Sequence, residues 1–137
     1  MCIRDRDTNV LSSLMKDPDG AVSQQIEKVG ERSICCSVIV ACELRYGAEK
    51  KNSAELKRRV DAILSAIPVV PLTQPVDKAY ADIRAELTSA GQPIGPNDLL
   101  IAAHALSEEM TLVTANLREF QRVRALSVED WELIRGK

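Results

Sequence analysis

The sequence has few aromatic residues, one histidine and no long hydrophobic run. Aromatic residues make up 3% of the 137 residues and hydrophobic residues 45%, so we expect a core of aliphatic side chains. No apolar stretch approaches the roughly 20 residues that a membrane-spanning helix needs, and no signal-peptide pattern precedes the first element. We therefore expect a soluble, cytoplasmic protein with no membrane contact, folded as a single domain over residues 1–137.

Charge and cysteine spacing exclude further classes of protein. The formal net charge of −2 argues against a strongly basic clamp for nucleic acid, so local patches or a metal ion must hold any polyanion. The four cysteines form no C-x-x-C pair, and a strand would send Cys35 and Cys36 to opposite faces. We expect the cysteines to be small buried hydrophobes in a reducing compartment. The sequence also lacks the glycine-rich motifs of nucleotide sites and the G-x-S-x-G motif of serine hydrolases.

Short apolar runs alternate with helical patterns along the chain. Strands separated by helices pair in parallel, so the sequence predicts a three-layer α/β/α domain with a central, mainly parallel sheet. Strands are expected at residues 3–6, 33–36, 69–72, 111–114 and 127–128, and helices at 10–15, 22–29, 38–50, 54–67, 76–90 and 96–106, with a short turn at 116–119.

The first strand does not fit this pattern. A central parallel strand is covered on both faces and is usually apolar, whereas Arg4, Asp5 and Arg6 are charged. The run Met-Cys-Ile-Arg-Asp-Arg resembles the translated end of a transposon-type sequencing adapter. Our hypothesis is that residues 1–6 are an assembly artefact that replaces an apolar start of the strand. Resequencing across this junction tests it.

Three acidic residues distant in sequence, Asp7, Glu43 and Asp98, stand beside breaks in the local pattern. Functional groups of such folds gather at the carboxyl ends of strands, and Asp7 and the segment 114–116 both end predicted strands. At ~5 Å and an effective dielectric near 20, three like-charge pairs cost about 10 kcal/mol, as much as a small domain's stability. A cation would remove this cost, and oxygen ligands alone suit Mg²⁺ or Mn²⁺ rather than zinc.

Each of these residues also has a structural interpretation. Asp7 could cap the following helix, and the helix dipole favours Asp98 in a first turn whatever its function. Glu43 lies in an apolar helical segment and faces either solvent or a site. Asn116 could be an N-cap whose partner is Glu119. We expect His104 to be a core or interface histidine rather than a catalytic base.

Four short motifs follow one another along the chain: Asp7-Thr8-Asn9, Cys42-Glu43-Leu44-x-Tyr46-Gly47, Gly95-Pro96-Asn97-Asp98 and Val113-Thr114-x-Asn116-x-x-Glu119-Phe120. In this order they resemble the motifs of PIN-domain ribonucleases, and among these the VapC-type toxins of bacterial toxin–antitoxin pairs.

The resemblance implies roles for individual residues. Asp7, Glu43 and Asp98 would be the acidic ligands of Mg²⁺ or Mn²⁺, and Asn116 falls where many PIN domains have a fourth acid. The supporting residues would be Thr8, Asn9, Thr114 and Glu119.

The implied activity is metal-dependent endonucleolytic hydrolysis of structured RNA, with tRNA as the suggested substrate. Water would be the nucleophile, giving 5′-phosphate and 3′-hydroxyl ends. The resemblance further implies a homodimer neutralised by a small antitoxin protein. Basic residues that follow the strand at 111–114 are the preferred RNA contacts: Arg118, Arg122 and Arg124.

Two other functions remain open from the sequence. One is a PIN-like scaffold that binds partners without cleaving RNA. The other is a receiver-like phosphoacceptor domain, which needs an aspartate at the end of its third strand. The segment 68–72 contains no aspartate, which argues strongly against the receiver-like alternative.

Overall fold

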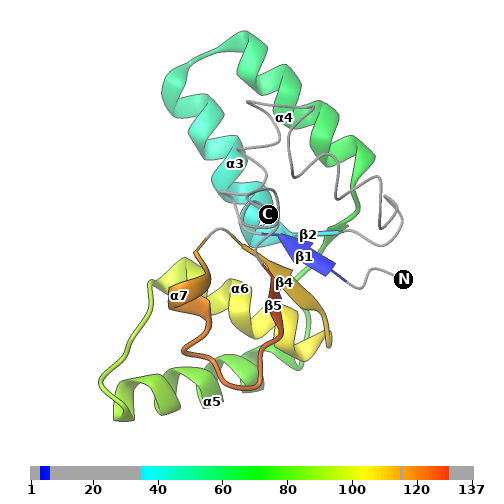
Figure 1. Cartoon of the computed structure of the whole chain (residues 1–137). Helices are drawn as coiled ribbons and strands as arrows, with labels where there is room; N and C mark the ends of the chain where they lie inside the picture. Colours follow the sequence, from blue (N-terminus) through cyan, green and yellow to red (C-terminus); the bar gives the residue numbers. More distant parts are fainter. Residues whose placement is uncertain (1–3, 7–34, 115, 130–137) are drawn as a thin grey trace, which may run out of the picture.

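The computed structural model describes residues 4–6, 35–114 and 116–129, with the backbone alone for residues 4–6. The helices expected at 10–15 and 22–29 lie outside these ranges. The elements in chain order are β1 (Arg4–Arg6), β2 (Cys36–Ser37), α3 (Val38–Lys51), α4 (Ala54–Ala66), β3 (Val69–Val70), α5 (Val76–Ser89), α6 (Pro96–Ser107), β4 (Thr111–Val113), α7 (Leu117–Phe120) and β5 (Val128–Glu129) (Figure 1).

The strands form parallel pairs, as expected. β4 pairs with β1 on one side and β5 on the other, giving the order β1-β4-β5, while β2 pairs with β3 in a second sheet. β1 and β2 are also in contact, so β1 lies between β2 and β4. Arg6, the last residue of β1, is in register with Val113, the last of β4. Both strands therefore end at the same edge of the sheet.

Serine residues begin two of the helices, as expected from their side-chain chemistry. The Ser37 hydroxyl accepts the N–H of Ile39 at 3.1 Å, and the Ser53 hydroxyl accepts the N–H of Leu56 at 3.1 Å. Each bond satisfies a donor that the first helical turn leaves without an intrahelical partner. Pro96 opens α6, where its missing N–H is no loss.

α6 is the central helix of the fold. Ile101, Ala102 and Ala103 are fully buried, and α6 contacts α5, α3, β2 and β4. In Figure 1, α3 and α4 lie side by side above the strands and α5 and α6 below them. The large residues with essentially no exposed surface are mostly aliphatic, with Phe120 the one aromatic among those described. This confirms the expected aliphatic core.

Three details differ from the sequence expectations. β3 ends at Val70 rather than at 72, because Pro71 has no N–H to continue the ladder. β2 extends to Ser37, which serves both as a strand residue and as the cap of α3. Cys35 and Cys36 are buried as expected, but Cys42 is exposed on α3, so the expectation of a buried cysteine was wrong there.

No helix in the described ranges is long and apolar enough to cross a lipid bilayer.

Candidate active site

Asp98 occupies the first turn of α6. Gly95 is the N-cap, and its carbonyl accepts the N–H of Leu99 at 2.9 Å. Asp98 is half-buried, and its Oδ2 lies 3.7 Å from the position that a Cβ atom on Gly95 would take. The partial positive charge at the start of a helix stabilises a carboxylate in this place. The fold therefore places this carboxylate beside the loop that leads into α6.

Glu43 reaches the same region from α3. It is half-buried and follows the exposed Cys42, while the next residue, Leu44, lies in the core. Its Oε2 accepts a long hydrogen bond of 3.5 Å from Nδ2 of Asn97, the residue before Asp98. Two helices thus bring residues 54 positions apart into contact. Glu43 therefore lies beside the first turn of α6.

Glu119 and Asn116 also lie near the first turn of α6. Glu119 accepts the backbone N–H of Gly95 at 3.0 Å through Oε1, and the side-chain amide of Asn116 through Oε2. Its Oε1 lies 4.0 Å from the same Cβ position on Gly95 that Asp98 approaches. Asn116 precedes α7 as its N-cap but makes no capping bond from its side chain. The side chain of Glu119, rather than the helix backbone, is its partner.

Thr114 joins this group to the end of β4. Its side chain is fully buried, and its hydroxyl accepts the N–H of Asn116 at 2.9 Å. Its own N–H donates to the carbonyl of Glu129 at 2.9 Å. These bonds fix the chain as it leaves the sheet toward Asn116.

Asp7, Thr8 and Asn9 lie outside the described residues. Within the described ranges, no three His, Cys, Asp or Glu side chains are close enough together to hold a metal ion. Among the three acids of the predicted triad, those described are Glu43 and Asp98.

His104 lies in the core rather than at this site. Its Nδ1 is 2.8 Å from the Ser37 hydroxyl, and its Nε2 has no hydrogen-bond partner of good geometry among the described residues. Burial lowers the pKa of His104 below its usual 6.5, although the Glu108 carboxylate and the Pro71 carbonyl act in the opposite direction. A buried, neutral imidazole in the last turn of α6 matches the expected core histidine.

The three arginines expected to contact RNA are all exposed, but they differ in their bonds. Nη1 of Arg122 donates to the carbonyl of Pro93 at 2.9 Å, so this side chain holds the loop before α6. Arg118 and Arg124 make no ion pair with a carboxylate of the described residues. Phe120 is fully buried and cannot stack on a base.

Sequence comparison places the chain in a family. The family model "PIN domain" matches residues 6–126. "Ribonuclease VapC2" of Rickettsia felis is 36% identical over 128 residues, covering 92% of this chain and 96% of the relative. "tRNA(fMet)-specific endonuclease VapC" of Shigella flexneri is 36% identical over 126 residues, covering 91% and 95%.

Solved structures agree with this placement. VapBC from Salmonella typhimurium, bound to DNA, superposes with a TM-score of 0.86 at 34% identity, over 96% of this chain and 99% of that one. VapBC2 from Rickettsia felis, bound to a DNA fragment from its promoter, gives 0.87 at 33% identity, over 93% and 98%. The chain therefore belongs to the PIN-domain family and, within it, to the VapC-type ribonucleases. This confirms both the α/β/α fold and the resemblance, and it removes the receiver-like alternative.

Two features of the site were not found from the sequence. Glu119 and Arg122 bind the loop at 93–96 to the α7 region. From the sequence, Glu119 was expected only as a supporting acid and Arg122 only as an RNA contact. A pocket beside that loop includes Tyr80 and Arg84 of α5. Tyr80 belongs to the apolar stripe of α5, and nothing in that periodicity distinguishes a core residue from one that lines a pocket.

Proposed function

We propose that the chain is a Mg²⁺- or Mn²⁺-dependent endoribonuclease and the toxin of a toxin–antitoxin pair, with Asp7, Glu43 and Asp98 as metal ligands. The observation that carries this proposal is the contact between Glu43 and the first turn of α6, which bears Asp98. Asp7 directly follows β1 in the sequence, and β1 ends level with β4. The acids would meet at the edge where ligands bind in parallel α/β sheets.

The donor set fits a hard divalent cation. Glu43 and Asp98 offer carboxylate oxygens, the ligands that Mg²⁺ and Mn²⁺ prefer in proteins. Such an ion, when bound, lowers the pKa of water and neutralises charge that develops on the scissile phosphate. Thr114 and Asn116 support the site from the end of β4, and Glu119 holds Gly95 so that the first turn of α6 keeps its place. Thr8 and Asn9 would shape the site around Asp7.

We infer that the substrate is a structured RNA, probed best with tRNA. One relative is named a tRNA(fMet)-specific endonuclease, and the exposed Arg118 and Arg124 can contact phosphates beside the site. Shape and phosphate recognition suits a folded RNA bound by a protein without net positive charge. Cleavage by water leaves 5′-phosphate and 3′-hydroxyl ends.

The partner we propose is a small antitoxin, with the toxin itself a homodimer in the cytoplasm. Two of the similar solved structures are of VapBC, which supports a second protein component. Tyr46 of α3 has 67% of its surface exposed, whereas Val40 of the same helix is fully buried. The side chain of Tyr46 is therefore accessible to a partner protein, whereas the side chain of Val40 packs in the core.

Cleavage of purified tRNA in Mg²⁺ tests the assignment. We expect Asp98→Asn and Asp7→Ala to lower the rate by about 100-fold or more while the protein stays folded. Asp77→Asn is the matched control, because Asp77 is an exposed acid in the first turn of α5. Metal-dependent cleavage retained by both site variants would remove these residues from the assignment. Folded wild-type protein that cleaves no RNA would support the scaffold alternative instead.

A further inference from the structure

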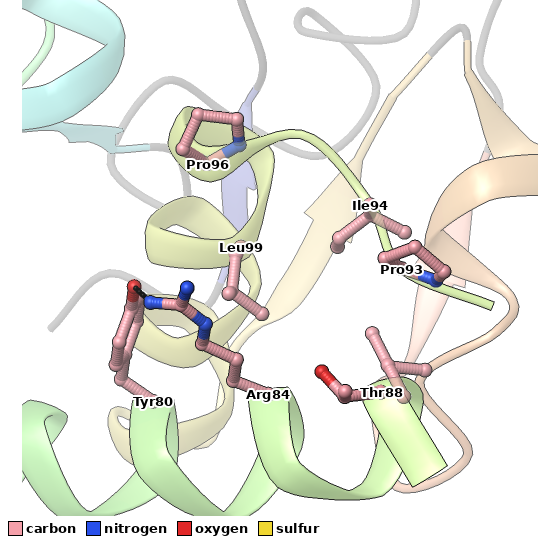
Figure 2. Close-up of a pocket in the computed structure, with 8 residues that line it drawn as sticks. Tyr80, Arg84, Thr88, Pro93, Ile94, Pro96 and Leu99 are labelled. Carbon is pink, nitrogen blue, oxygen red and sulfur yellow. Dashed lines mark hydrogen bonds between the residues drawn. The ribbon is translucent and has the colours of Figure 1, made fainter. Parts of the chain in front are cut away.

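A pocket of about 340 Å³ opens between α5 and the chain segment that leads into α6 (Figure 2). α5 lines it with Tyr80, Arg84 and Thr88, while residues 93–96 and Leu99 close the other side. The pocket therefore combines a cation, a phenol and a hydroxyl with an apolar wall. Its size is at the lower end of the roughly 300–1,000 Å³ typical of small-molecule sites.

Tyr80 and Arg84 hold each other in one arrangement within this pocket. Nη1 of Arg84 donates to the Tyr80 hydroxyl at 2.8 Å, and the guanidinium carbon lies over the ring, 5.9 Å from its centre. Arg84 is exposed and makes no ion pair with any carboxylate in the part of the chain that the structure describes. Its charge is thus available to an external anion, and its planar group is already oriented.

The pocket shares a wall with the acidic site. Residues 93–96 face the pocket through Pro93, Ile94 and Pro96, while the backbone N–H of the intervening Gly95 donates to Glu119. A Cβ atom on Gly95 would lie 3.7 Å from Oδ2 of Asp98. The Arg122 side chain fixes the carbonyl of Pro93 from the same side as Glu119. The segment 93–96 therefore lines the pocket and also binds Glu119 of the acidic site.

We propose that this pocket binds an unpaired nucleotide of the RNA substrate, next to the cleaved phosphodiester bond, with its base against the Arg84–Tyr80 pair. The proposal rests on the ribonuclease function proposed above and adds a position for the substrate. Unpaired bases stack on tyrosine rings and on arginine planes, and a guanidinium also attracts the adjoining phosphate. Leu99 and Ile94 supply apolar surface for the other face of a base. The pocket accepts one nucleotide and not a helix, so the cut would fall beside an unpaired loop.

Photocrosslinking tests the position directly. The probe is an RNA stem-loop oligonucleotide carrying 5-iodouridine at one loop position at a time, bound to the Asp98→Asn protein so that it stays intact. We expect the crosslink on Tyr80, within the tryptic peptide 79–84. The second tyrosine, Tyr46, is more exposed and lies in the separate tryptic peptide 46–50, so it serves as an internal control. Crosslinks on the Tyr46 peptide alone would overturn the proposal.

Kinetics give a second, independent test. We expect Arg84→Gln and Tyr80→Leu to raise KM by roughly 5- to 150-fold with little change in kcat, the range expected for loss of one stacked base. Arg58→Gln, an exposed arginine of α4, is the control and should keep the wild-type KM. An abasic nucleotide in the loop should raise the KM of the wild type by a similar factor and leave the KM of the Arg84→Gln enzyme unchanged. A wild-type KM for Arg84→Gln, an exposed residue whose loss does not threaten folding, would overturn the proposal.

The outcomes separate this proposal from the one on which it rests. If the protein neither cleaves RNA nor forms any crosslink, both the ribonuclease function and the nucleotide pocket are wrong. Cleavage that depends on Asp98, with Arg84→Gln behaving as wild type, would remove the nucleotide pocket alone. If Arg84→Gln halves the molecular mass in light scattering while KM stays unchanged, a second copy of the chain covers the pocket, and the proposal is wrong.

Discussion

Nδ1 of His104 lies 2.8 Å from the hydroxyl oxygen of Ser37, and this buried contact joins the last turn of α6 to the cap of α3. The same hydroxyl accepts the N–H of Ile39, so one side chain both begins a helix and binds its neighbour. α3 carries Glu43 and α6 carries Asp98. The contact therefore fixes the two acid-bearing helices relative to each other from within the core.

Ser37→Ala should destabilise the protein more than Ser53→Ala. Both serines cap a helix with a hydrogen bond of 3.1 Å, and losing a cap costs about 1 kcal/mol. The Ser37→Ala substitution also removes the hydroxyl that binds Nδ1 of the buried His104, which adds a loss of about 1–3 kcal/mol. Urea unfolding of the two variants measures the difference. Equal losses would show that the histidine contact contributes nothing to stability.

His104 should make stability depend on pH near neutrality. Burial lowers its pKa in the folded state below the usual 6.5, so between these two values the unfolded chain binds more protons than the folded chain. Its contribution to stability is therefore complete above about pH 6.5 and falls as the pH drops toward the lower, folded-state pKa. Urea unfolding from about pH 7.5 to about pH 5.5 should show this decline in the wild type and a shallower one in His104→Gln. Identical slopes would contradict it.

Charged residues in β1 should lower the stability of the sheet. β1 lies between β2 and β4, where parallel strands are normally apolar on both faces. Replacing Arg4 and Arg6 together by valine should raise the unfolding free energy by about 1–3 kcal/mol, or Tm by about 3–10 °C. Arg58→Val on the exposed side of α4 controls for the general effect of removing arginine. A lower Tm for the β1 variant would show that these guanidinium groups are well satisfied.

The helix starts could be predicted because the signals are local. A hydroxyl at Ser37 or Ser53 bonds a backbone N–H two or three residues on, and Pro96 lacks an N–H that α6 does not need. The many apolar residues of α6 likewise agree with its buried place in the fold. Such features depend on neighbours within one turn of the chain, which the sequence displays directly.

The rest depends on contacts between distant segments. The sequence offers no sign that Glu119 binds the N–H of Gly95, 24 residues away, or that Arg122 binds Pro93. The exposure of Cys42 depends on how α3 rotates against its neighbours, which its weakly amphipathic sequence does not specify. Helical spacing placed Tyr80 on the packed face of α5 but could not show a pocket there. These properties arise from packing and not from local preference.

The side chain of Asn116 is neutral, and replacing it with aspartate should reveal how much negative charge the region around Glu119 tolerates. Its amide donates to Oε2 of Glu119, whose other oxygen accepts from Gly95. Asn116→Ala removes one hydrogen bond and should cost about 0.5–1.5 kcal/mol. Asn116→Asp adds repulsion between two carboxylates, at most about 3 kcal/mol at ~5 Å and less where solvent screens the pair. Without metal, the aspartate variant should therefore unfold at a lower urea concentration than the alanine variant.

Saturating MgCl₂ should then stabilise Asn116→Asp more than the wild type, because a cation neutralises the added charge. An aspartate variant as stable as the wild type without metal would mean that the region around Glu119 tolerates a second carboxylate without a cation.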